Sequence, residues 1–252
     1  MAKPISVQLY SLRERAKQDF VGVLKFLGEL GYVGVETAGL HNMKALEVRK
    51  VIDDLGMVCS SMHVPVPNKD NIALTADQAN DLGTDMIIAG LGPKEFATVE
   101  ARKAAVAKLT EGCELAASAG LRFGYHNHWW EFEPVDGEAP YELLLREIPD
   151  LFSQLDTYWA ADFGAVDVPR VVRTHAGRIA SLHIKDGPLL RDQPHTAVGK
   201  GKMNIKPIVD EADPAVLEWM VVELDSCATD MSQAVADSYT YLVASGLAAG
   251  RK

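Results

Sequence analysis

Short apolar runs rich in β-branched residues alternate along this chain with segments of helical periodicity. The first run, 5–10, precedes a segment whose apolar residues fall on one face of a helix: Phe20, Val23, Leu24, Leu27 and Leu30. Gly31 follows the last of them, as glycine commonly does just past the C-terminal end of a helix. Gly56, Gly83 and Gly120 close three later segments in the same way. The pattern therefore predicts repeated strand–helix units.

Eight such units fill the chain. Strands are predicted at 5–10, 34–37, 57–63, 85–89, 121–127, 152–156, 179–184 and 219–224, and helices at about 20–30, 43–55, 75–82, 98–119, 141–147, 169–175, near 205, and at 232–243. This alternation predicts a parallel sheet with helical crossovers. Eight repeats in 252 residues favour a closed (β/α)8 barrel over an open doubly wound sheet. We predict a single α/β barrel domain over 1–252, because no linker or change of composition divides the chain.

Composition and charge limit the kinds of partner that this protein can bind. The formal net charge is −10, which argues against nucleic acid, because binding to a phosphate backbone needs a basic surface. The cysteines Cys59, Cys113 and Cys227 are far apart and form no Cys-x-x-Cys pair, as in a reducing compartment. No apolar run approaches the roughly 20 residues that span a bilayer. We predict a cytoplasmic protein without membrane contact, and a homo-oligomer is compatible with the sequence.

Polar residues gather where the predicted strands end. In a (β/α)8 barrel these ends form the active-site mouth. The set comprises Gln8, Tyr10, Glu36, His63, His126, His128, Asp156, His183, Lys185, Glu223 and Asp225. So many polar side chains at one end of the barrel predict a functional site.

Three of these residues suit a divalent metal ion. Asp156, His183 and Glu223 end strands six, seven and eight, and ligands without thiolate suit Mn, Mg, Co or Zn. Taken alone, an aspartate at a strand end is often a helix cap and a histidine is often a core residue. The prediction of a metal site therefore rests on the occurrence of all three residues at neighbouring strand ends. A fourth ligand should come from strand five. There His126 and His128 share one face if the strand continues, and Glu131 lies further on.

The motifs in this chain resemble the xylose isomerase-like TIM-barrel superfamily. They are Val-Gln-Leu-Tyr-Ser-Leu-Arg, Gly-Tyr-x-Gly-Val-Glu, Tyr-His-Asn-His-x-x-Glu-Phe, Leu-Asp-Thr-Tyr-Trp, Leu-His-Ile-Lys-Asp-Gly and Val-Val-Glu-Leu-Asp. The superfamily includes sugar phosphate isomerases/epimerases, ketose 3-epimerases, inosose dehydratase and endonuclease IV. The resemblance covers nearly the whole chain and implies one divalent metal ion held by Glu, Asp, His and Glu. Asp156, His183 and Glu223 match three of these ligands. Glu131 is the expected fourth, with His126 and His128 as alternatives.

The resemblance also implies a reaction, the removal of a proton next to a carbonyl. The metal would stabilise the enediolate as a Lewis acid, and carboxylates or imidazoles would move the proton. The expected roles are as follows: metal ligands and proton carriers Glu131 and Glu223, acid/base histidines His126 and His128, a substrate-oxygen contact from Lys185, and pocket walls from Gln8, His63 and Trp159. We expect a sugar or keto-sugar as substrate.

Two other functions remain as alternatives, and a third is disfavoured. The first is a lyase or dehydratase, including one that cleaves a 3-keto-glycoside, which the pair His126 and His128 would serve. A second is a non-catalytic sugar-binding barrel, which would not need its metal ligands. The endonuclease branch is disfavoured, because Trp159 stands where that enzyme has a metal-binding histidine. The segment 198–202 contains two lysines but does not match a known phosphate-binding loop.

Overall fold

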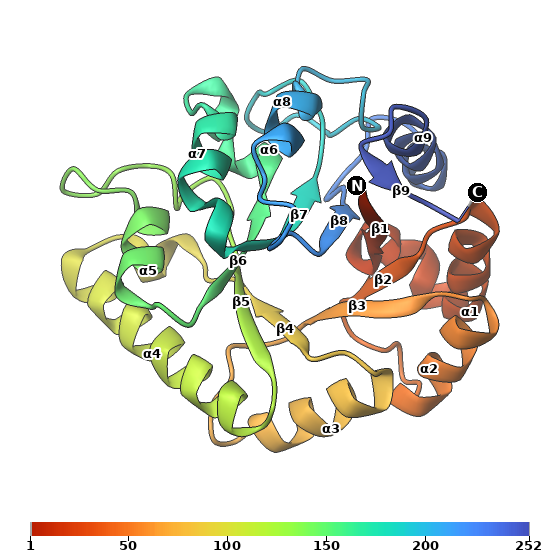
Figure 1. Cartoon of the computed structure of the whole chain (residues 1–252), viewed down its shortest axis with the longest axis horizontal. Helices are drawn as coiled ribbons and strands as arrows, with labels where there is room; N and C mark the ends of the chain where they lie inside the picture. Colours follow the sequence, from red (N-terminus) through yellow and green to blue (C-terminus); the bar gives the residue numbers. More distant parts are fainter. Residues whose placement is uncertain (1, 252) are drawn as a thin grey trace.

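The computed structural model describes residues 2–251 and confirms the closed barrel (Figure 1). Eight parallel strands form its wall: β1 Lys3–Gln8, β2 Gly34–Thr37, β3 Val58–His63, β4 Met86–Ala89, β5 Arg122–His126, β6 Phe152–Asp156, β7 Ile179–Ile184 and β8 Trp219–Val222. Each strand pairs with the next in sequence, and pairing of β8 with β1 and of β1 with β2 closes the ring. A short strand, β9 Ala248–Ala249, adds to β1 outside the ring and was not predicted.

Helices connect the strands and cover the outside of the barrel (Figure 1). They are α1 Arg13–Leu30, α2 Ala45–Asp54, α3 Ile72–Leu82, α4 Val99–Ser118, α5 Pro140–Glu147, α6 Thr157–Ala160, α7 Val168–His175, α8 Ile205–Asp210 and α9 Met231–Ala244. Most predicted helix ends differ from these by one to three residues. Gly31 ends α1 with φ of 106°, a left-handed conformation that glycine adopts without steric cost.

The first strand is shorter at its C-terminal end than predicted. It stops at Gln8 instead of Tyr10, and Leu9–Leu12 form a 3₁₀ turn. The Gln8 side chain accepts a hydrogen bond from the Tyr10 backbone N–H at 3.0 Å, which caps this turn. Tyr10 is consequently 44% exposed at the barrel mouth.

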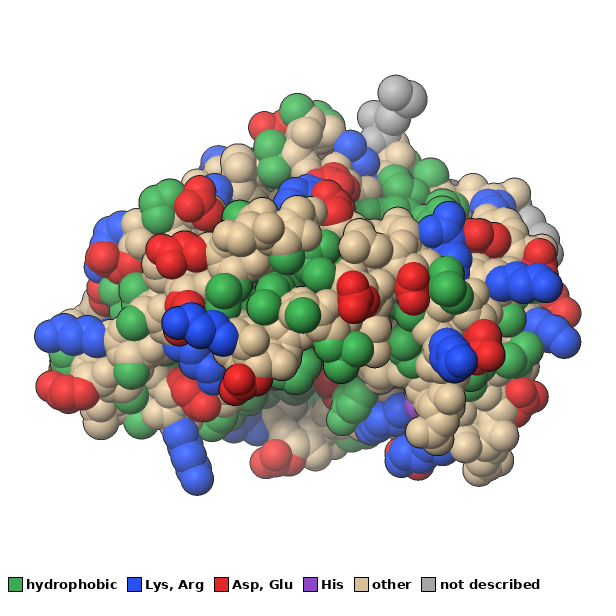
Figure 2. All heavy atoms as spheres, turned by 90° about the horizontal axis from the view of Figure 1, so that it is seen from below, with side chains coloured by type: hydrophobic (Ala, Val, Ile, Leu, Met, Phe, Trp, Pro, Cys, Tyr) green, Lys and Arg blue, Asp and Glu red, His purple; other side chains and the backbone are tan. Residues whose placement is uncertain are grey.

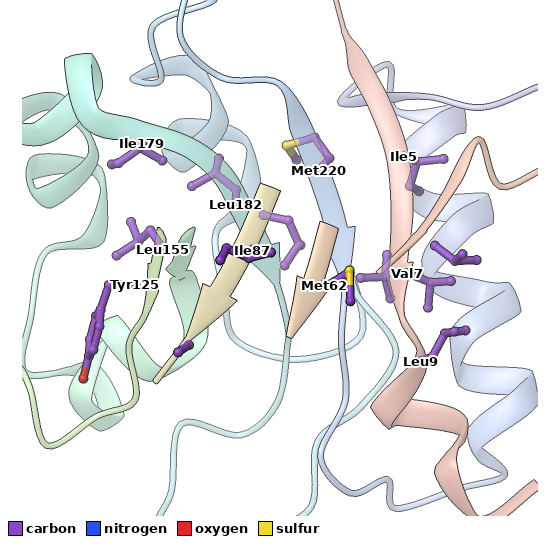
Figure 3. Packing of buried hydrophobic residues seen from close by; sticks show 14 of the residues in the cluster. Ile5, Val7, Leu9, Met62, Ile87, Tyr125, Leu155, Ile179, Leu182 and Met220 are labelled. Atoms are coloured by element: carbon purple, nitrogen blue, oxygen red, sulfur yellow. The ribbon is translucent and has the colours of Figure 1, made fainter. Parts of the chain in front are cut away.

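The barrel strands separate apolar from polar side chains by alternation. Figure 3 shows Ile5 and Val7 of β1 within the hydrophobic core cluster. The alternate residues make polar contacts across the strands: Ser6 Oγ lies 2.7 Å from Ser60 Oγ, and Gln8 Nε2 donates to Glu36 Oε1 at 2.6 Å. Barrel interiors are usually filled by branched apolar residues. Here the interior supplies a buried polar network below the mouth.

On the face seen in Figure 2, acidic and basic side chains of the described residues are interspersed among apolar ones. Within residues 2–251, no helix is both long enough and apolar enough to cross a membrane.

Candidate metal centre

Four buried side chains meet at the C-terminal mouth of strands β5 to β8. His126, Asp156, His183 and Glu223 each offer a ligand atom, and these four atoms lie within 4.8 Å of one another. His126 and Asp156 are the last residues of β5 and β6, His183 lies near the end of β7, and Glu223 follows β8 directly. Adjacent parallel strands therefore deliver two imidazole nitrogens and two carboxylates to one point, which we call the metal cluster.

Hydrogen bonds fix which ring nitrogens of this cluster are available. His183 Nε2 lies 2.7 Å from Glu36 Oε1, and its Nδ1 lies 2.8 Å from Glu223 Oε2. His126 Nδ1 lies 3.0 Å from Gln154 Oε1, and Gln154 Nε2 donates to Glu36 at 2.5 Å, so this amide oxygen must face the imidazole. His126 therefore donates from Nδ1 and keeps Nε2 free, an arrangement typical of metal-binding histidines.

Glu36 is the hub beneath the metal cluster. Its carboxylate accepts hydrogen bonds from Gln8, Ser61 and Gln154, and both His183 and His63 reach it, the latter at 3.0 Å. Burial alone would raise its pKa, but the charges of His63 and His183 hold the pKa of Glu36 well below its usual value. Glu36 is therefore an ionised carboxylate that orients His183.

Protonation of the two cluster histidines differs. Burial opposes a charge on His183, but Glu36 and Glu223 outweigh it and raise the pKa of His183 to about 10. Burial, with the neighbouring charge of His183, lowers the pKa of His126 well below its usual value. His126 is thus neutral at pH 7, whereas His183 must release a proton before it can bind a metal ion.

Lys185 lies against the same carboxylates. Its fully buried ammonium is 2.8 Å from Asp156 Oδ2, 2.8 Å from Glu223 Oε2 and 2.7 Å from Asp225 Oδ2. We expected this lysine to contact a substrate oxygen. In the structure its charge is balanced by three carboxylates, and the contact with substrate stays a prediction.

The residues of the metal cluster fit a divalent ion. The Asp156 Oδ2 atom is buried and, although close to Lys185, has no aligned hydrogen bond. Two imidazoles and two carboxylates without thiolate are ligands that Mn, Co, Zn and Mg accept. Each imidazole has a hydrogen-bond partner on its far nitrogen. An ion at this point would bind a buried carboxylate oxygen that has ion pairs but no aligned hydrogen bond among the described residues.

Glu131, the expected fourth ligand, lies outside the metal cluster. Its buried carboxylate accepts from Tyr125 Oη at 2.6 Å and from the His128 backbone N–H at 2.8 Å. These bonds tie the segment after β5 back onto its own strand. The alternative, His126, lies with Asp156, His183 and Glu223. Glu131 therefore has a positioning role for His128 in this structure.

An open cavity of about 590 Å³ adjoins the metal cluster, and we call it the first cavity. Its polar walls come from His63, His126, His128 and Glu223, with Tyr10, Trp130 and Asp225 beside them. The ring of His128 stacks on Trp130 with centroids 4.2 Å apart. At Gly90 a Cβ atom would lie 2.9 Å from the His126 carbonyl oxygen, so glycine keeps this wall close to the site.

Two expected substrate contacts lie elsewhere. Gln8 is fully buried, and both ends of its amide are bonded, to Glu36 and to the Tyr10 backbone. Trp159 lines a different cavity of about 580 Å³, the second cavity, together with Trp129, Phe163 and the segment 190–195. Only His63, of the three predicted pocket residues, lines the first cavity.

The lysine-containing segment 198–202 is organised by a buried carboxylate. Asp186 accepts from the backbone N–H groups of Gly187, Gly199, Gly201 and Met203 at 2.8 to 2.9 Å. A bound phosphate would need these backbone N–H groups as donors, but they already donate to the Asp186 carboxylate.

Sequence reasoning did not assign roles to Glu36, Gln154 or the pairing of Asp225 with Lys185. Glu36 was recognisable as a charged residue within a four-residue strand, Gly34–Thr37, where burial is the rule. Gln154 had no comparable signal, because it lies inside β6 and only the closed barrel brings it to Glu36.

Comparison with known proteins shows the family of this chain. Residues 24–239 match the family described as xylose isomerase-like TIM barrel, and the chain belongs to this family. No curated protein matches the chain by sequence.

Solved structures with the same fold have diverse descriptions. A sugar phosphate isomerase/epimerase from Parabacteroides distasonis ATCC 8503 is 25% identical, with a TM-score of 0.81 over 99% of this chain and 96% of the other. The probable 3-DHS dehydratase AsbF from Bacillus anthracis is 16% identical, with a TM-score of 0.76 over 95% and 98% of the two chains. The IOLI protein with a binding zinc atom is 14% identical, with a TM-score of 0.75 over 97% of each chain. The structural neighbours of this chain thus carry isomerase/epimerase and dehydratase descriptions.

Proposed function

We propose that this protein is a divalent-metal-dependent isomerase or epimerase that moves a proton next to the carbonyl of a sugar or keto-sugar. The observation that carries the proposal is the metal cluster at the edge of the open first cavity. The similarity to the Parabacteroides sugar phosphate isomerase/epimerase supports the same reaction class. A small-molecule sugar, rather than nucleic acid, is part of this proposal.

The residues suit the two demands of the reaction. A bound divalent ion supplies Lewis-acid stabilisation of the enediolate oxygen. Glu223 lines the first cavity. Burial alone would raise its pKa, but the charges of Lys185 and His183 outweigh burial and hold the pKa of Glu223 well below its usual value, so it is ionised. His63 and His128 line the same cavity, and imidazoles there can serve as acid or base toward a bound substrate.

A lyase or dehydratase is the second candidate. Two imidazoles, His126 and His128, line the first cavity with ring centroids 5.2 Å apart. The buried Nδ1 of His128 has no hydrogen-bond partner among the described residues, and the Glu131 carboxylate lies 3.9 Å from it. An imidazole pair of this kind suits the protonation of a leaving hydroxyl or glycosidic oxygen.

The experiment is a metal measurement followed by an exchange assay. Wild type purified without chelator should contain about one divalent ion per chain. The His126→Ala and Glu223→Gln variants should lose it, while Glu131→Gln and the exposed control Glu142→Gln should keep it. Proton exchange from keto-sugars in D2O should then require the ion.

Product mass separates the enzyme candidates, because only isomerisation conserves the mass of the substrate. A protein that binds sugars without metal, with no exchange after addition of Mn or Co, would instead be a sugar-binding barrel.

A further inference from the structure

The second cavity lies against the metal cluster and holds none of its ligands. It shares Asp225 with the first cavity, and Asp225 pairs with Lys185 at the cluster. Its volume, about 580 Å³, matches the 590 Å³ of the first cavity. The two cavities therefore meet at one carboxylate beside the proposed reaction centre.

Three aromatic rings line the second cavity, beside polar residues that include Arg191, Asp192 and His195. The centroid of Phe163 lies 5.8 Å from that of Trp129 and 6.3 Å from that of Trp159. The guanidinium of Arg191 stacks 4.0 Å above Trp129 and 4.6 Å from Phe163, and its charge is paired with Glu133 at 2.5 Å. Because Arg191 and Asp225 are already paired, the cavity offers aromatic faces beside polar groups, which suits a neutral ring with an apolar face.

Backbone strain is concentrated around this cavity. Of seven non-glycine residues with positive φ in the described part of the chain, four lie in the two loops that form it: Asp162, Phe163, Leu189 and Asp192. Phe163 has φ of 54° and ψ of 27°, a conformation that is unusual for a bulky side chain. Its ring is half-buried and lies outside the hydrophobic core cluster. Strain that persists without a core-packing reason is typical of functional sites.

We infer that the second cavity binds a second ring of the substrate, a neutral sugar or aryl group joined through a short linkage to the sugar at the metal cluster. This inference rests on the proposed function and narrows the substrate class to keto-sugars that carry a second ring, with the carbonyl on a carbon that the linkage does not block. The first cavity holds the reacting sugar, and Trp129, Trp159 and Phe163 enclose the attached ring. Asp225 lies where the linkage passes from one cavity to the other.

Calorimetry with paired methyl and phenyl glycopyranosides of glucose, galactose and mannose tests the inference on metal-loaded protein. For at least one sugar the phenyl glycoside should bind about tenfold more tightly than the methyl glycoside, since an aromatic contact of this kind contributes about that factor. The preference should fall to about twofold in Trp129→Ala and stay unchanged in Trp219→Phe, at the opposite end of the barrel.

Phe163→Gly separates binding from folding. Glycine adopts positive φ freely, so this variant should keep or raise the melting temperature while losing the phenyl preference. A phenyl-to-methyl ratio near one for all three sugars, or no binding of any phenyl glycoside, would overturn the inference. It would also be overturned by a large fall in melting temperature with the preference intact. Proton exchange on free monosaccharides alongside a ratio near one would keep the proposed function and reject only the second-ring site.

Discussion

Replacing Asp186 by asparagine should destabilise the loop that carries one wall of the second cavity. The carboxylate of Asp186 accepts four backbone N–H bonds, two on each oxygen. Asparagine keeps the shape but replaces one oxygen by an NH₂ group, so two of the four N–H groups lose their acceptor and face a donor. Hydrogen bonds to a charged group contribute about 1.5–3 kcal/mol each, so the expected loss is about 3–6 kcal/mol.

Urea unfolding followed by circular dichroism measures this loss. A domain is stable by about 5–15 kcal/mol in total, so the midpoint should shift clearly. Asp54→Asn, at an exposed position on α2, is the matched control and should change stability by less than about 0.5 kcal/mol. Hydrogen exchange should show opening of the segment 187–203 before the strands. A loss below about 1 kcal/mol, with an unchanged denaturant slope, would refute the assignment of Asp186 as the clamp of this loop.

Three further predictions concern the interior. Glu36→Gln should weaken Mn binding about 10- to 100-fold by calorimetry, because it removes the carboxylate that orients His183; an unchanged affinity would contradict this role. Mn affinity should rise between pH 6 and pH 8 by up to about tenfold per unit, because His183 has a raised pKa of about 10 and the ion must displace its proton; a flat profile would show that His183 is already neutral. Burial raises the pKa of the Cys59 and Cys113 thiols to about 12, so a thiol reagent at pH 8 should modify only Cys227 in native protein, with three sites reacting after denaturation.

Residues that end a strand were predictable as site residues, because a parallel barrel brings all such ends to one rim. Asp156, His183 and Glu223 follow from this rule alone, and the structure brings them together. The rule does not apply to residues in the loop beyond a strand end. Glu131 and His126 are only five positions apart, but the first lies in a loop whose path depends on hydrogen bonds to Tyr125 and His128.

The features that the sequence by itself determined are those that depend on interactions between residues close together in the chain. Alternation of apolar residues, glycines after helices and polar residues at strand ends are short-range signals, and they define the barrel and three members of the metal cluster. Only the tertiary structure decided the rest: the hub at Glu36, the pairing of Lys185 with three carboxylates, and the second cavity. These features join residues from distant strands and loops. Their geometry depends on closure of the ring and on loop paths, which no local pattern in the chain encodes.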